Sequence, residues 1–203
     1  MTLHPDAVCK ECFKDYELPR GNWLDFIYQQ QIVLQNFICK KRNGLQVPKI
    51  DNITQEHVYE SLYHYACMMM EYRELMTAPN DIERDFEYID VLFFLCNIGI
   101  YAGIKNVKLL DFNNLSFIST DIFSMQILKF LDLLPFKKWK TYKPEDFQLT
   151  DEQKETYNLA LNLWICYGLR YFDYTEKYIF SLYMSKLTEN KNRQIIKDRG
   201  YIG

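Results

Sequence analysis

Four carboxylates are the residues of this chain whose types and spacing best fit a chemical role. Glu71 and Glu74 are three residues apart, and Glu87 and Asp90 repeat that spacing. Residues three apart lie on the same face of a helix, so each pair presents two carboxylates together. Carboxylate oxygens are ligands that Mg²⁺ and Mn²⁺ prefer. The two pairs therefore predict one divalent-metal site formed by all four residues.

The segment between the two pairs predicts how they meet. Ala78-Pro79-Asn80-Asp81 ends one helix and caps the next, which makes the two helices antiparallel neighbours. Counted from this turn, Glu74 and Glu87 differ in depth by only about 3 Å, so the pairs converge. Asp90 lies inside the apolar run of residues 89–95, where clustered carboxylates are costly and repel each other unless a cation joins them. The alternative is that each pair lies on a solvated helix face.

Two other arrangements of metal-ligand residues occur in the chain. One stripe of the first helix of the pair carries four candidate ligands, namely His57, Glu60, His64 and Glu71. A di-iron carboxylate bundle needs Glu-x-x-His spacing and ligands from four helices, so we interpret His57 and His64 as ordinary surface or core histidines. Cys9 and Cys12, together with His4, resemble half of a zinc site, but a structural zinc needs four ligands.

A second polar cluster lies near the C-terminal end. One face of the last predicted helix carries Tyr183, Lys186, Asn190, Arg193 and Gln194. Lysine and arginine one or two turns apart can hold adjacent phosphates, and a tyrosine or asparagine beside them can bind a sugar hydroxyl. The alternative is a solvated basic helix end that favours the helix dipole.

The elements that must position these residues are helices. They are predicted at residues 24–42, 54–77, 82–101 and 150–170, with a short helix after Asp121 and a last helix from Tyr174 into the 190s. Thr54 is a helix N-cap, Gly103 a helix end, and Thr150 with Gln153 a capping box. Residues 1–23, 105–120 and 134–149 are expected to be irregular. The fold class is all-α: a single domain over residues 1–203, a helical bundle whose central antiparallel hairpin carries the metal ligands.

Composition limits the classes of protein that fit. The chain has 203 residues, of which 48% are hydrophobic, and a net charge of −3. No basic field attracts duplex nucleic acid, no apolar run is long enough to span a membrane, and no secretory signal is evident. The six cysteines lie mostly in apolar or helical contexts, which is typical of reduced, packed thiols. We therefore expect a cytoplasmic protein.

Four segments together resemble the all-α nucleotide pyrophosphatases, especially the dimeric dUTPases and the phage-type dCTP/dUTP pyrophosphatases. Residues 31–35 (QIVLQ) are similar to an early Q-x-x-L-(N/Q) segment, and residues 71–75 (EYREL) to the E-x-x-E-L metal motif. Residues 87–90 (EYID), followed by Phe94 and Asn97, resemble the second motif, E-x-x-D. The tail from Tyr183 to Gln194, with residues 198–201 (DRGY), resembles the closing phosphate-binding motif.

The resemblance implies Mg²⁺-dependent cleavage of dUTP and/or dCTP to the monophosphate and pyrophosphate by a homodimer. In that reading, the four carboxylates hold Mg²⁺ on the triphosphate, and Glu71 or Glu74 helps to take a proton from the attacking water. The remaining roles implied are phosphate contacts for Lys186 and Arg193, sugar or phosphate contacts for Tyr183, Asn190 and Tyr201, and base contacts for Gln31 and Asn97.

The chain also departs from the family pattern. Dimeric dUTPases carry a histidine where this chain has Phe93, and they carry tryptophans between the two metal motifs, where residues 76–86 have none. Residues 195–197 form an extra insertion in the tail. These departures concern the base, so a pyrophosphatase of the same fold with relaxed or purine specificity is an open alternative. A helical protein that binds nucleotides or protein partners without catalysis is another.

Overall fold

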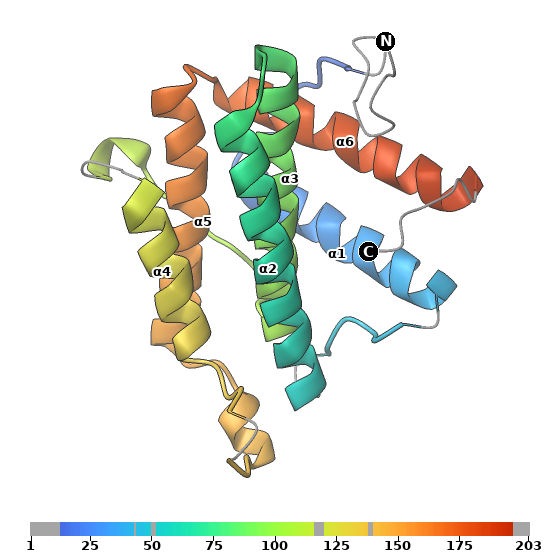
Figure 1. The fold of residues 1–203 in the computed structure, drawn as a ribbon, viewed down its shortest axis with the longest axis vertical. Coiled ribbons are helices and arrows are strands. Elements are labelled where there is room, and N and C mark those ends of the chain that lie inside the picture. Colours follow the sequence, from blue (N-terminus) through green and yellow to red (C-terminus); the bar gives the residue numbers. More distant parts are fainter. Residues whose placement is uncertain (1–12, 43, 50–51, 116–119, 138–139, 197–203) are drawn as a thin grey trace.

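The computed structural model describes residues 13–42, 44–49, 52–115, 120–137 and 140–196. Within these ranges the chain is all-α and contains no strand (Figure 1). The six α-helices and two short 3₁₀ helices are α1 (Trp23–Arg42), α2 (Gln55–Thr77), α3 (Asp81–Ala102), η1 (Phe112–Asn114), α4 (Thr120–Asp132), η2 (Pro144–Phe147), α5 (Asp151–Tyr171) and α6 (Glu176–Ile196). The predicted fold class is therefore confirmed.

Local residues set the ends of the α2–α3 hairpin. Thr54 precedes α2, and its amide donates a hydrogen bond to His57 Nδ1 at 3.1 Å. The Asn80 side chain caps α3 by accepting a hydrogen bond from the Glu83 amide at 3.0 Å. Gly103 ends α3 in the left-handed region, with φ of 96°. The predicted antiparallel hairpin and its capping residues are confirmed.

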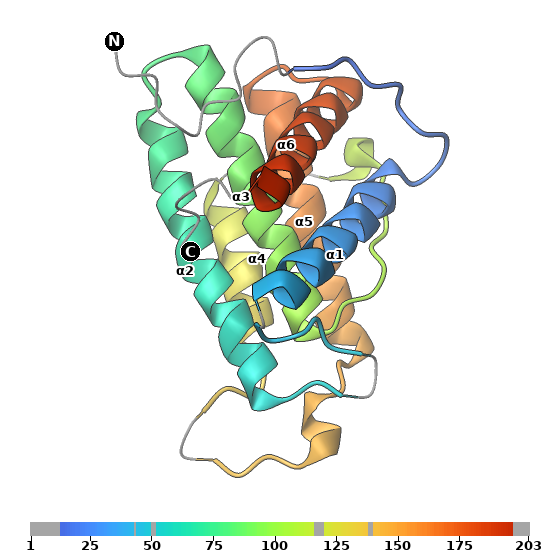
Figure 2. The ribbon, with the colours of Figure 1, turned by 90° about the vertical axis from the view of Figure 1, so that its right-hand side faces the viewer.

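Within the hairpin, α3 lies at the centre of the bundle, whereas α2 packs mainly against α3. Helix α3 packs against α2, α1, α5 and α6, and nearly every residue from Tyr88 to Ala102 is buried. Figure 1 shows α2 to α5 standing roughly upright, while α1 and α6 lie side by side and cross them at an angle. The same crossing is visible from the side in Figure 2.

Close packing fixes α3 against α5. The Tyr157 hydroxyl donates to the Leu95 carbonyl at 3.0 Å, and the Tyr88 ring stacks on Trp164 with centroids 5.0 Å apart. Gly99 allows the closest approach, because a Cβ atom there would lie 2.2 Å from the Tyr157 ring. These contacts anchor the helix that carries half of the predicted metal ligands.

Most of the outer elements match those predicted from the sequence. α5 opens with the predicted capping box, in which the Thr150 amide donates to Gln153 Oε1 at 2.7 Å. Residues 13–22 are irregular as expected, and the Tyr16 amide ties them to Ser181 Oγ on α6 at 3.0 Å. Residues 105–120 and 134–149 were expected to be wholly irregular, which is wrong: they include η1 and η2. Asp111 caps η1 by accepting from the Asn113 amide, and such short side-chain caps leave little signal in a sequence.

None of the helices in the described part of the chain combines the length and the hydropathy needed to cross a bilayer.

Candidate functional site

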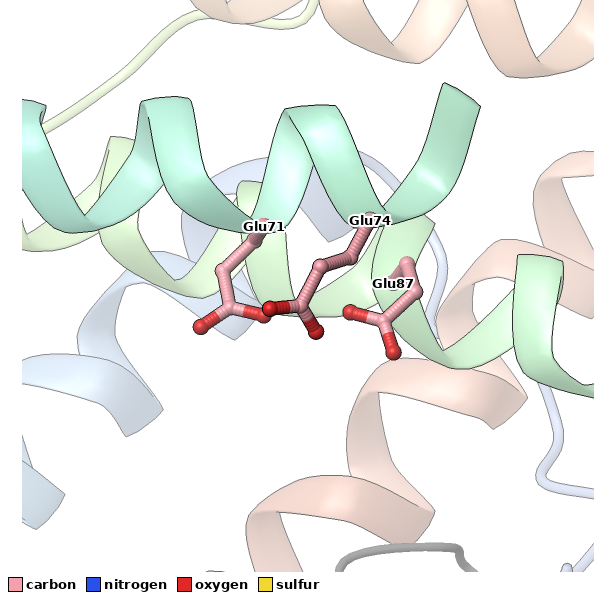
Figure 3. Close-up of side chains that lie close together, drawn as sticks. All are labelled: Glu71, Glu74 and Glu87. Atoms are coloured by element: carbon pink, nitrogen blue, oxygen red, sulfur yellow. The ribbon is translucent and has the colours of Figure 1, made fainter. Parts of the chain in front are cut away.

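Three of the four predicted metal ligands come together on the hairpin. Glu71 and Glu74 extend from α2 and Glu87 extends from α3, with their carboxylates side by side (Figure 3). One oxygen from each lies within 4.8 Å of the others. Three converging carboxylates offer the all-oxygen environment that suits Mg²⁺ or Mn²⁺, so these residues fit the predicted cofactor.

The fourth predicted ligand, Asp90, is held by a lysine instead of joining the three glutamates. Its Oδ2 accepts a hydrogen bond from Lys186 Nζ at 2.8 Å, and the two side chains are only 16% and 2% exposed. Lys186 lies on α6, so this crossing helix brings a buried positive charge next to the Asp90 carboxylate of the hairpin. The structure thus places Lys186 on a metal-ligand candidate, whereas the resemblance implies a phosphate contact.

The electrostatics of the cluster favour a bound cation. Burial, followed by the nearby Asp90 charge, raises the pKa of Glu71 to about 8. Burial also raises the pKa of Glu87, and Glu87 Oε2 is buried without a hydrogen-bond partner among the described residues. Carboxylates that are crowded and partly desolvated hold protons until a metal ion replaces those protons. The donor set and its pKa shifts therefore suit a divalent ion.

A cavity of about 600 Å³ opens beside the cluster, between the hairpin and the crossing helices α1 and α6. Its wall brings together residues from all three predicted groups: Glu71 and Asp90, Gln31 and Asn97, and Asn190 and Arg193. Arg193 is hydrogen-bonded to Glu189 on its own helix. Tyr201 lies outside the described residues, as do Cys9, Cys12 and His4.

The two amides predicted to contact the base both line the cavity and are hydrogen-bonded to each other. Gln31 Nε2 donates to Asn97 Oδ1 at 2.8 Å, and the Tyr183 hydroxyl donates to Gln31 Oε1 at 2.8 Å. Tyr183 is fully buried and stacks on Phe93 with ring centroids 4.4 Å apart. Its ring therefore lies behind the cavity wall, and the predicted direct contact with sugar or phosphate is not what the structure shows. Phe93 supplies the apolar surface for this stack.

His64 is a cavity residue that the sequence analysis treated as ordinary. It lines the cavity and stacks on Tyr101 with centroids 5.2 Å apart, and its Nε2 lies 3.6 Å from Glu60 Oε1. Burial lowers its pKa to about 4, so the ring is neutral near pH 7. The signal that could have identified it is spacing: His64 precedes Glu71 by seven residues, as Asn97 follows Asp90 by seven. At 1.5 Å per residue, His64 lies about 10 Å from Glu71 along α2, and Asn97 lies about 10 Å from Asp90 along α3.

In this fold His57 is not free to act as a ligand of the di-iron site that was considered from the sequence. His57 Nδ1 accepts from the Thr54 amide at 3.1 Å, and Nε2 lies 2.9 Å from the Gln46 carbonyl oxygen. Both ring nitrogens therefore serve to cap α2 and to hold the preceding loop. His57 is a structural histidine, as the sequence analysis expected.

The chain matches no family model, no curated protein sequence and no solved structure.

Proposed function

We propose that this protein hydrolyses a pyrimidine deoxynucleoside triphosphate, dUTP and/or dCTP, to the monophosphate and pyrophosphate with Mg²⁺ as cofactor. The observation that carries this proposal is that one cavity is lined both by carboxylates, Glu71 and Asp90, and by a pair of amides, Gln31 and Asn97. Along α3, Asn97 lies about 10 Å from Asp90. A nucleotide needs both groups, because its phosphates require cations, which the carboxylates can hold, and its base requires hydrogen-bonding side chains such as amides. The motif resemblance gives the same division of roles.

The carboxylates are proposed to hold the metal and to manage the proton. Glu71, Glu74 and Glu87 are the main ligands, and Asp90 completes the set from its place beside Lys186. Bound Mg²⁺ would lower the pKa of a water molecule and offset the charge of the triphosphate. Glu71 or Glu74 would take a proton from the attacking water, since both carboxylates lie in the cluster that would hold the metal.

Cationic side chains on α6 are proposed to receive the phosphates. Arg193 lines the cavity and can offer two parallel N–H groups to a phosphate. Lys186 offsets part of the negative charge of the carboxylates through its ion pair with Asp90. Asn190, also on the wall, is placed between these cations in the sequence and is proposed to bind the sugar or a phosphate.

A substrate panel tests the function. Pyrophosphate release is measured for the four common deoxynucleoside triphosphates and dUTP, with Mg²⁺ and with a chelator. We expect dUTP or dCTP to be the best substrate and the chelator to abolish release. Faster turnover of purine triphosphates would instead support the pyrophosphatase of relaxed or purine specificity.

A pair of matched variants separates catalysis from simple binding. Glu74→Gln removes a ligand and should lower turnover by about a hundredfold or more, whereas Glu155→Gln changes an exposed glutamate of α5 and should leave turnover unchanged. Equal pyrophosphate release by the wild type and Glu74→Gln would refute the assignment and favour a non-catalytic helical binding protein.

The cellular setting and the assembly are part of the proposal. Cys39, Cys67, Cys96 and Cys166 are buried free thiols, which supports the reducing environment of a cytoplasm. The homodimer is supported by the motif resemblance alone, and light scattering of the purified protein tests it: a single-chain mass would refute it.

A further inference from the structure

We propose that Glu60 and His64 bind Zn²⁺, or a transition metal of similar ligand preference, at a second metal site that is separate from the three glutamates of the hairpin. Both side chains come from α2 and line the cavity. They are four positions apart, so they lie one turn from each other on the same helix face. Binding of this ion does not depend on the proposed hydrolysis.

The first observation is that the ring nitrogens of His64 have no hydrogen-bond partner. His64 is only 8% exposed, and its Nδ1 and Nε2 are both buried without a hydrogen bond in the described part of the chain. Buried polar atoms are nearly always satisfied in folded proteins, and leaving one unpaired costs free energy. A ligand that binds the imidazole would account for a histidine at this position of the cavity wall.

The second observation is the distance between the two proposed ligand atoms. His64 Nε2 lies 3.6 Å from Glu60 Oε1, which is too long for a hydrogen bond. Two atoms that each bind one Zn²⁺ ion at about 2.1 Å, with a tetrahedral angle between them, lie about 3.4 Å apart. The two ligand atoms are therefore already close to the spacing that a shared ion requires.

The protonation states of the two groups also suit a metal ion. Burial lowers the pKa of His64 to about 4, so the imidazole is neutral near pH 7 and a metal ion has no proton to displace from it. Burial raises the pKa of the Glu60 carboxyl, because partial burial disfavours its charged form. A divalent cation between the two groups would stabilise the carboxylate.

Aromatic side chains hold the imidazole in place. The His64 ring stacks on Tyr101 with centroids 5.2 Å apart, and the rings of Tyr63 and Phe94 lie at 5.6 and 5.8 Å. A metal-binding histidine is usually oriented by a hydrogen bond on its other ring nitrogen. In this site the three neighbouring rings supply that orientation, so the ligand needs little rearrangement when the ion binds.

The donor set distinguishes this site from the three glutamates. An imidazole nitrogen suits Zn²⁺ and related transition metals, whereas Mg²⁺ prefers oxygen ligands. The Glu60 side chain is 35% exposed, so an ion that enters the cavity can meet this carboxylate before the buried imidazole. Two protein ligands leave two positions of a tetrahedral ion for water or for a bound molecule. Seven residues, or about 10 Å of α2, separate His64 from Glu71.

Calorimetric titration with Zn²⁺ tests the site, with excess Mg²⁺ present to occupy the three glutamates. Every protein carries Cys9→Ser and Cys12→Ser, which removes another zinc-like pair of residues. We expect the affinity for Zn²⁺ to fall by about tenfold or more in Glu60→Gln and in His64→Gln. The matched control Glu56→Gln, which changes an exposed glutamate one turn earlier on α2, should bind Zn²⁺ as the parent protein does. Equal affinity in all four proteins would overturn the proposal.

Nitrogen NMR of the imidazole rings identifies the ligand atom without any substitution on α2. Zn²⁺ should shift the Nε2 resonance of His64, and Mg²⁺ should leave it unchanged. His57 is an internal control, because both of its ring nitrogens already have partners. A His64 signal that does not respond to Zn²⁺, or that responds equally to Mg²⁺, would overturn the proposal. Neither measurement requires a nucleotide, so zinc binding and the proposed hydrolysis can fail separately.

Discussion

Replacing Lys186 with methionine should destabilise the metal-free protein by about 3 kcal/mol. Lys186 Nζ lies 2.8 Å from Asp90 Oδ2, with side chains that are 2% and 16% exposed. Methionine retains much of the aliphatic volume of the lysine but removes its charge. The Asp90 carboxylate then lies partly buried, without its cation and close to Glu71, whose pKa Asp90 already raises. Breaking one side of a buried pair in this way is much more costly than removing both sides.

Urea and thermal unfolding with a chelator present measure the effect. For a chain of this length, a loss of about 3 kcal/mol corresponds to a fall in Tm of roughly 6–12 °C. The double variant Lys186→Met/Asp90→Asn should recover about 2 kcal/mol of the loss, because it also removes the unpaired carboxylate. Mg²⁺ should stabilise Lys186→Met more than it stabilises the wild type, since a metal ion supplies the missing positive charge.

The reasoning fails if Lys186→Met loses less than about 1 kcal/mol, which is typical of an exposed ion pair. It also fails if the double variant is less stable than Lys186→Met alone, because the carboxylate would then contribute through contacts other than the lysine. A matched control is Lys154→Met, which removes the cation of an exposed pair with Asp151 on α5 and should change stability by less than about 0.5 kcal/mol.

Three further outcomes are expected from the structure. Because the pKa of Glu71 is raised from 4.5 to about 8, the metal-free protein should lose stability as the pH rises through this interval; a flat pH profile in chelator would contradict this. Because the pKa of His64 is lowered from 6.5 to about 4, stability should also fall as the pH drops from 6.5 to 4, and His64→Gln should flatten that acid limb if the histidine is its cause. Gly99→Ala places a Cβ atom 2.2 Å from the Tyr157 ring and should cost about 1–3 kcal/mol in urea unfolding; a cost near zero would mean that the ring moves freely.

The hairpin could be predicted from sequence because its determinants are local. Thr54, Asn80 and Gly103 each act within a few residues of themselves, and the i,i+3 spacing of the carboxylates specifies a helix face directly. The depth match across a short turn follows from helix geometry alone. This is why three of the four predicted metal ligands meet without any knowledge of the remaining fold.

The roles on α6 could not be predicted, because they depend on how steeply that helix crosses the bundle. Tyr183, Lys186, Asn190 and Arg193 share one face, as the sequence indicated, but the crossing buries the first two and leaves the last two on the cavity wall. The Tyr183–Gln31 hydrogen bond joins residues 152 positions apart. Spacing along one helix shows which residues share a face and gives no information on their depth in the core.

The seven-residue spacing that α2 and α3 share divides the cavity wall into two levels. His64 and Asn97 occupy one level of the hairpin, while Glu71 and Asp90 occupy another, two turns away on the same two helices. Under the proposed function, substitutions at the first level would alter base recognition while the helices keep the second level in register. Base preference and metal binding would then be open to change one level at a time on an unchanged scaffold.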